Sequence, residues 1–337
     1  MNRLFDRHRL IRVLACIAML SPIVAGAQTI CVWDPMGAQG DGYNTMKDYV
    51  IAARGWGSNV SITLKPYTDE RVATEDFKAG QCDAALITGL RARQFNQFVG
   101  SIDSVGSIPS YTHMRDVVDL LANPKLAPNM VSGPYEIAGA VPIGAGYFFV
   151  NDRSINTLAK AAGKKIAVFD WDKSQAEMVK MVGAQPVSAD ITTFGGKFNN
   201  NQVDIIVAPI FAYKPMELYK GLGTKGGIAR FPVIQITFQL VLKKDKFPAG
   251  FGQKSREYIA NQVPRFFGLI RNTEREVDPK FWMHVPLADR GGYDKIMREL
   301  RIHLTKAGFY DKRMMTLLKR IRCKREPDAA ECTLSDE

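Results

Sequence analysis

The chain contains a two-part sequence pattern twice, in the same order, and this duplication most constrains its fold. The first part is an apolar segment that ends in an aromatic residue and Asp, at residues 30–34 and 166–170. The second part is Phe-x-x-(Gly/Asn)-Gln-x-Asp followed by an apolar run, at residues 77–86 and 198–207. The repeat predicts two similar lobes on one chain, an arrangement suited to closing a cleft around a ligand.

The N-terminal segment has the composition of a secretory signal peptide. A positive region holds Arg3, Arg7, Arg9 and Arg12, a short apolar region covers 13–25, and small residues precede position 28. We therefore predict a signal peptide at 1–27, cleavage after Ala27 and a periplasmic mature chain.

Two alternatives to a cleaved signal peptide are weaker. A membrane anchor would need a longer apolar run, and this one contains Pro22. A lipoprotein modified at Cys16 would favour a small residue where Leu14 stands.

The cysteines that follow the cleavage site are even in number, which predicts disulfides in an oxidising compartment. Four cysteines allow three pairings, of which we favour Cys31 with Cys82, both at strands of one lobe, and Cys323 with Cys332 as a local clip. No CxxC occurs and the histidines are scattered, so neither a metal nor another cofactor is expected.

The formal net charge of +11 is unevenly distributed. The basic excess lies in residues 243–325, and the tail at 326–337 is acidic. A solvated helical face is the simplest interpretation; contact with anionic lipid or an acidic partner is the alternative. Export argues against a nucleic-acid partner.

Hydrophobic periodicity and turn residues predict alternating strands and helices, hence parallel sheets with crossover connections. The predicted fold class is α/β, with two lobes and C-terminal helices. The predicted domains are lobe I at 28–142 plus about 233–285, lobe II at 143–232, basic helices at 286–325 and an acidic tail at 326–337. Expected strands are 28–33, 60–66, 83–88, 137–141, 146–150, 166–169, 185–187, 203–209 and 233–242. Expected helices are 43–54, 68–80 with Thr68 as N-cap, 174–182, 191–198, 254–272, 293–308 and 313–324.

In an open parallel sheet, ligands bind beyond the carboxyl ends of the strands. The aromatic-Asp pairs of the repeat stand at such ends and should face each other across the gap. Alternatively, the two Asp residues cap the following turns, the arginines are surface charges and the aromatic residues pack in the core. The candidate ligand-binding residues are Trp33, Asp34, Arg91, Arg93, Tyr147, Phe169, Asp170, Trp171, Phe211 and Tyr213.

Residues 30–242, most clearly 146–222, resemble the solute receptors of TRAP (tripartite ATP-independent periplasmic) transporters, the DctP-like solute-binding proteins. The resemblance is carried by residues 77–86, 163–168, 183–187 and 203–207. It implies an α/β, two-lobed periplasmic-binding-protein fold (type II-like) with C-terminal helices, in a hinged binding protein that delivers a small solute to a membrane permease.

The chain departs from that family at two positions. The resemblance implies an Arg for the solute carboxylate where Ala167 stands, and an Asn where Ala208 stands. Without the guanidinium there is no bidentate carboxylate clamp, so organic-acid specificity is not carried over.

Three functions compete on this basis. A periplasmic solute receptor for TRAP-type uptake is the first, with a hinge near 140–150 and 228–236. An accessory or interaction protein of an efflux or envelope system, without pump activity and using the basic helices at 293–325, is the alternative. A hydrolase is not expected, because neither Gly-x-Ser-x-Gly nor His-Glu-x-x-His occurs.

Overall fold

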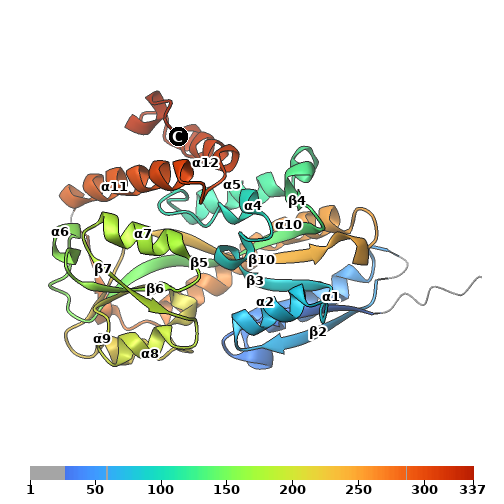
Figure 1. The fold of residues 1–337 in the computed structure, drawn as a ribbon, viewed down its shortest axis with the longest axis horizontal. Coiled ribbons are helices and arrows are strands. Elements are labelled where there is room, and N and C mark those ends of the chain that lie inside the picture. Colours follow the sequence, from blue (N-terminus) through green and yellow to red (C-terminus); the bar gives the residue numbers. More distant parts are fainter. Residues whose placement is uncertain (1–26, 58–59, 286) are drawn as a thin grey trace, which may run out of the picture.

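The computed structural model describes residues 27–57, 60–285 and 287–337 and shows one continuous mixed sheet flanked by helices (Figure 1). Its strands are β1 (Gln28–Trp33), β2 (Ile62–Tyr67), β3 (Ala84–Thr88), β4 (Val131–Ser132), β5 (Tyr135–Val150), β6 (Lys165–Phe169), β7 (Gln185–Ala189), β8 (Ile205–Pro209), β9 (Gly227–Ala229), β10 (Ile234–Lys243) and β11 (Trp282–Met283). The order along the sheet is β2-β1-β3-β10-β5-β8-β6-β7, with β4, β9 and β11 beside this path.

The sheet has a parallel part at each end. Strands β1, β2 and β3 are parallel to one another, as are β6, β7 and β8. Antiparallel strands β10 and β5 lie between the two parts. The two parallel parts correspond to the two copies of the sequence pattern, so the predicted two-lobed α/β fold is confirmed.

Lobe I surrounds β1, β2 and β3, and a single apolar cluster forms its core, with Phe77 and Met114 among its fully buried side chains. Lobe II surrounds β6 and β8 and has two smaller clusters, around Phe198 and Val179. The helices are α1 (Asp41–Ala53), α2 (Glu70–Lys78), α3 (Gly89–Ala92), α4 (Gln97–Gly100), α5 (Tyr111–Leu121), α6 (Leu158–Ala161), α7 (Lys173–Met181), α8 (Phe194–Asn199), α9 (Tyr219–Leu222), α10 (Phe251–Arg275), α11 (Leu287–Lys306) and α12 (Lys312–Arg325). Short 3-10 helices cover Gly37–Gln39, Pro124–Met130, Ile210–Ala212, Lys244–Lys246, Pro279–Phe281 and Ala330–Thr333.

The central strand β5 differs from the prediction of two strands at 137–141 and 146–150. It runs unbroken from Tyr135 to Val150 and pairs with β10 and then with β8. Pro142 lies at a register shift of the β5–β10 ladder, where the regular hydrogen bonding is interrupted. A bulge accommodates a residue that has no backbone N–H to donate, so the strand continues through the proline.

Several helix starts also differ from the prediction, and the largest shift is that of α11, which begins at Leu287 and not at 293. Asp69, and not Thr68, caps α2, because its carboxylate accepts hydrogen bonds from the backbone N–H groups of Arg71 and Val72. The helix expected at 191–198 begins only at Phe194. The carboxylate of Asp190 holds the preceding residues in a turn by accepting from two backbone N–H groups.

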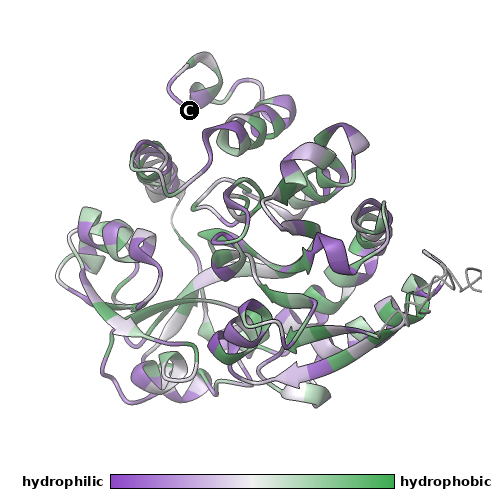
Figure 2. Cartoon of the chain, turned by 45° about the vertical axis from the view of Figure 1, so that its right-hand side comes forward, coloured by the Kyte–Doolittle hydropathy of each residue, from purple (hydrophilic) through white to green (hydrophobic). Residues whose placement is uncertain are grey.

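The C-terminal helices connect the two lobes. α11 contacts α7 of lobe II, whereas α12 contacts α4 and α5 of lobe I. The pair, drawn in red in Figure 1, therefore lies across one side of the molecule. Both helices alternate polar and apolar residues (Figure 2), as expected for helices that cover a core on one face.

The basic C-terminal segment is not simply a solvated face. Arg301, Lys319 and Arg322 are buried. Glu337 of the acidic tail lies within 2.6 Å of Arg301 and 3.0 Å of Arg322. Glu331 approaches the same two guanidinium groups, at 3.1 and 2.6 Å. The tail therefore neutralises buried cations of α11 and α12, which the charge distribution in the sequence did not reveal.

Both predicted disulfides are present. Cys31 of β1 is bonded to Cys82, with Cα atoms 5.8 Å apart, and Cys323 to Cys332, with Cα atoms 5.6 Å apart. The first bond joins β1 to the entry of β3, and the second joins the end of α12 to the tail.

No helix among the described residues has the length and apolar character needed to cross a membrane. The predicted signal peptide at 1–27 falls, apart from its last residue, outside the residues that the structure describes.

The acidic tail should stabilise the fold through its ion pairs with buried arginines. We expect Glu331→Gln to lower the free energy of unfolding by roughly 2 kcal/mol, because two buried guanidinium groups each lose one charged partner and keep Glu337. Urea denaturation at pH 7 measures this.

The exposed carboxylate of Asp328 in the same tail provides the control. Asp328→Asn should change the free energy of unfolding by less than about 0.5 kcal/mol. Equal effects of the two substitutions would contradict a structural role for the tail.

Candidate functional site

A cavity of about 200 Å³ lies between the two lobes. Strand ends from both lobes contribute to its wall: Trp33 of β1 and Thr88 of β3 from lobe I, and Phe169 of β6 and Pro209 of β8 from lobe II. These positions are carboxyl ends of parallel strands, where open α/β sheets bind ligands. The site therefore lies where the sequence analysis places it.

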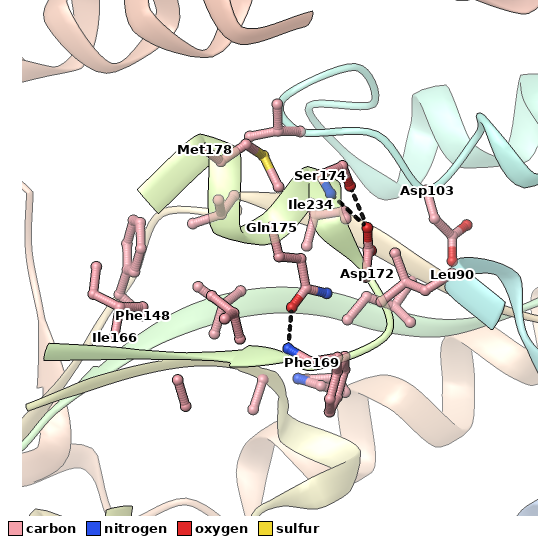
Figure 3. A pocket seen from close by; sticks show the side chains of 18 of the residues that line it. Leu90, Asp103, Phe148, Ile166, Phe169, Asp172, Ser174, Gln175, Met178 and Ile234 are labelled. Carbon is pink, nitrogen blue, oxygen red and sulfur yellow. Dashed lines mark hydrogen bonds between the residues drawn. The ribbon is translucent and has the colours of Figure 1, made fainter. Parts of the chain in front are cut away.

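Polar side chains gather at one end of the cavity. Figure 3 shows Asp103, Asp172 and Ser174 near this end, whereas Phe148 and Ile166 lie at the other. The polar lining residues are Glu70, Thr88, Arg93, Asp103, Asp172, Ser174 and Gln175.

Glu70 and Arg91 form a buried pair at the polar end. Glu70 Oε1 accepts hydrogen bonds from the backbone N–H and the hydroxyl of Thr88, at 2.7 and 2.6 Å. Its Oε2 accepts from Nε of Arg91 at 3.0 Å. This pair ties the start of α2 to the end of β3 and leaves Arg91 outside the cavity lining.

Arg93 lines the cavity, but its donors are used within the protein. Nε donates to the Gly100 carbonyl at 3.2 Å, and a terminal nitrogen donates to the Asp103 carbonyl at 3.1 Å. The other terminal nitrogen donates to Oγ of Ser174 at 3.4 Å and lies 3.8 Å from Oδ2 of Asp172. Arg93 thus joins lobe I to the start of α7 in lobe II.

Asp172 is the N-cap of α7. Its Oδ1 accepts from the backbone N–H of Ser174 at 3.0 Å and from the Ser174 hydroxyl at 2.5 Å. Oδ2 is buried and accepts no hydrogen bond from any described residue. A carboxylate oxygen in this situation has an unfilled capacity for a donor.

Asp103 is fully buried behind the polar end. Its oxygens accept from the backbone N–H and the hydroxyl of Thr237, at 3.0 and 2.8 Å. Burial raises the pKa of Asp103 to about 7, against the lowering effect of these hydrogen bonds. Gly89 packs so closely that a Cβ there would lie 2.5 Å from the carboxylate, so glycine is required for this approach.

The rest of the wall is apolar. β6 contributes Ile166 and Val168, and α7 contributes Met178 and Val179. The C-terminal helix α11 closes one side with side chains that include Met297. α11 is thus part of the site, a contribution that its amphipathic sequence alone did not indicate.

Additional contacts join the lobes around the cavity. The guanidinium of Arg91 lies 4.2 Å from the ring centroid of Trp171, a cation–π contact between lobe I and lobe II. The ring of Phe211 meets that of Phe238 of β10 edge-on at 5.7 Å, and Phe238 in turn contacts Trp33 at 5.5 Å. The two lobes therefore touch directly in this structure.

The structure separates the candidate residues into two groups. Trp33, Arg93, Phe169 and Phe211 line the cavity. The cavity lining does not include Asp34, Arg91, Tyr147, Asp170, Trp171 or Tyr213.

The residues of the second group make contacts elsewhere in the protein or face solvent. Asp34 is buried and accepts from the backbone N–H groups of Met36 and Tyr43, and burial raises its pKa. Tyr147 donates its hydroxyl hydrogen to Glu274, and Tyr213 packs in the core of lobe II. Asp170 is exposed.

Trp171 stacks on Phe169 with ring centroids 5.4 Å apart, directly behind the cavity wall. Its indole Nε1 is buried and has no hydrogen-bond partner among the described residues.

Sequence reasoning missed Asp103, Asp172, Ser174 and Gln175. The Asp-x-Ser spacing before α7 is an N-cap signal, which could have drawn attention to Asp172. Asp103 had no signal, because it reaches the site from a loop between short helices. Ala167 and Ala208, where the resemblance to TRAP receptors implies Arg and Asn, both line the cavity.

No group of three or more His, Cys, Asp or Glu side chains in the described part of the chain is arranged to hold a metal ion. The site therefore consists of an apolar chamber with a charged end.

A family model described as solute-binding protein AdeT 1/2 matches residues 51–337. This chain belongs to that family. The probable solute-binding protein AdeT1 of Acinetobacter baumannii is 54% identical over 306 residues, which cover 91% of this chain and 100% of that protein. The probable solute-binding protein AdeT2 of the same organism is 27% identical over 237 residues, or 70% of this chain and 100% of that protein.

Solved structures with the same fold are TRAP periplasmic solute-binding proteins. One from Desulfovibrio salexigens, with bound orotic acid, has a TM-score of 0.72 at 15% identity and covers 88% of this chain and 99% of its own. One from Sulfurospirillum deleyianum, with bound succinate, has a TM-score of 0.66 at 12% identity and covers 87% and 99%. These matches confirm the predicted fold.

The buried carboxyl of Asp103 should make stability depend on pH. Its folded pKa of about 7 lies above the unfolded value of 3.8, so its contribution is fully present below pH 4 and is lost as the pH rises to 7. We expect the stability of the wild type relative to Asp103→Asn to fall by at most about 4 kcal/mol over this interval.

Urea denaturation of both proteins at several pH values measures this difference. Asp76→Asn provides a comparison of opposite sign: hydrogen bonds from Tyr67 and Lys65 lower the pKa of Asp76, so its contribution is constant from pH 4 to 7 and is lost only as the pH falls below 4. A difference between wild type and Asp103→Asn that stays constant from pH 4 to 7 would contradict the assignment.

Proposed function

We propose that this protein is a periplasmic solute receptor that closes two lobes around a small solute and delivers it to a membrane permease for TRAP-type uptake. The observation that carries the proposal is the cavity formed by strand ends of both lobes. Membership of a solute-binding protein family and the fold shared with TRAP receptors support it.

The hinge would lie in the two strands shared by the lobes. β5 and β10 carry register shifts at Ile236/Thr237 and Leu240/Val241, and Gly144 has φ 116°. Irregular pairing and a glycine in this region allow backbone rotation without breaking the sheet. In this proposal lobe I comprises 28–142 and about 233–285, lobe II comprises 143–232, and helices at 286–325 precede the tail.

Export would follow cleavage after Ala27. The hydrogen bond from Arg93 to Ser174 and the cation–π contact of Arg91 with Trp171 would form as the lobes close. Of the six candidate residues outside the cavity lining, Arg91 and Trp171 would then act on the closure, and not by touching the solute.

The alternative, an accessory protein of an efflux or envelope system, depends on free charge in the basic helices. The acidic tail neutralises part of that charge, because Glu331 and Glu337 pair with Arg301 and Arg322. The receptor is therefore the better supported function.

A true solute should stabilise the mature protein. A ligand at about 100 times its Kd should add about 2.7 kcal/mol to the free energy of unfolding. A thermal-shift screen of acids, amines, sugars and apolar compounds measures this. Absence of any stabilising compound, together with co-purification of a membrane partner, would favour the accessory function.

The contact of Arg91 with Trp171 should act on closure. We expect Trp171→Leu to lower the affinity for every solute by the same factor of about five. The reason is that loss of about 1 kcal/mol from the closed state lowers the population of the binding-competent state. Isothermal titration calorimetry on two unrelated hits measures the factor. Tyr219→Leu, which removes an exposed aromatic residue of lobe II, is the control. A loss confined to one solute would show that Trp171 touches that solute directly.

A further inference from the structure

The body of the cavity offers a ligand almost no polar partner. Ile166 and Val168 of β6, Val179 and Met178 of α7 and Met297 of α11 form its walls. A sugar or other polyhydroxylated molecule placed there would lose its hydrogen bonds to water without replacement. The body therefore fits the hydrocarbon part of a ligand.

The size of the cavity restricts that hydrocarbon part. A protein cavity of about 150 Å³ holds one benzene molecule. The volume of about 200 Å³ between the lobes suits a single ring with a short side chain.

The polar end does not suit a carboxylate. Arg93 is the one basic side chain among the described residues that line the cavity. It already donates to the carbonyls of Gly100 and Asp103 and to Oγ of Ser174. It also faces Asp172, so no guanidinium edge is left for a bidentate contact with an acid.

The same end contains more carboxylates than cations. Glu70 is paired with Arg91 at 3.0 Å, and Asp172 lies 3.8 Å from Arg93. Asp103 has hydrogen bonds to Thr237 but no ion pair. Above pH 7, where Asp103 is mainly ionised, the surplus is one acidic group, and a surplus of negative charge behind a buried surface favours a cation.

The second oxygen of Asp172 marks where that cation would be held. Asp172 is 6% exposed and lines the cavity. Its Oδ2 lies 3.8 Å from the guanidinium of Arg93, beyond hydrogen-bond distance, and accepts no hydrogen bond from a described residue. In Figure 3 it lies at the junction between the polar end and the apolar body, beside Ser174 and Gln175. An ammonium group at this point could donate to Oδ2 while its hydrocarbon part occupies the chamber.

We infer that the cavity selects a small apolar molecule with a cationic, hydrogen-bond-donating end, such as a hydrophobic primary amine, and that Oδ2 of Asp172 receives the donor. This rests on the proposed function as a solute receptor. It names the class of solute and assigns the residue that discriminates it from organic acids.

Three probes of matched shape test the selectivity: 2-phenylethylamine, 2-phenylethanol and phenylacetate. Calorimetric titration of the full mature protein at pH 8 should give at least tenfold tighter binding for the amine than for phenylacetate, with the alcohol between them. Succinate and β-D-galacturonate, the ligands in two structures of the same fold, are included as polar acids.

Substitution of Asp172 tests the residue. Asp172→Asn should lower the affinity for the amine at least tenfold and change the affinity for the alcohol less than threefold. Asp172→Ser is the second variant, because serine can still cap α7 but carries no charge. Glu177→Gln is the control, since this half-exposed carboxylate is on the same helix but does not line the cavity.

Tighter binding of phenylacetate than of the amine would overturn the inference, as would equal losses for amine and alcohol in both Asp172 variants. Binding of succinate or galacturonate without any aromatic probe would overturn it and leave the receptor function intact. Failure of every compound, here and in the broad thermal-shift screen, would instead remove the receptor function itself.

Discussion

The antiparallel pairing of β5 with β10 is the constraint on which the rest of the structure depends. It runs from Tyr135 opposite Lys243 to Gly146 opposite Ile234 and connects the two parallel parts of the sheet, which share no other strand pairing among the described residues. A cleft between these two parts is possible only because both are attached to this ladder. The register shifts within it give the connection freedom to bend without separating the strands.

The chemistry of the cavity follows from how the surrounding charges are paired. Arg91 and Arg93, the arginines nearest the strand end of lobe I, are held by Glu70, by backbone carbonyls and by lobe II. Their charge therefore organises the closed arrangement and is not left for a solute. The cavity therefore offers a ligand an apolar chamber and, at its polar end, Oδ2 of Asp172.

The C-terminal segment also contributes to the cavity. α11 supplies part of the apolar wall, and it is held in place by α12 and the acidic tail through the buried Arg301 and Arg322. Buried guanidinium groups require charged partners, so the position of the helix depends on the last residues of the chain. A site between two lobes thus depends on a segment that belongs to neither parallel sheet.

The sequence by itself determined the parallel sheets, the two disulfides and the edge of the sheet at which the cavity lies. These features depend on local periodicity and on a repeat that can be read along the chain. Only the tertiary structure decided which strand-end side chains face the cavity. The repeat gives Asp34 and Asp170 equivalent positions in the sequence, whereas packing gives them different environments. Asp34 is enclosed by its own glycine-rich loop, and Asp170 points to solvent. Asp172, two residues beyond the repeat, lines the cavity, because the start of α7 turns its N-cap toward the other lobe.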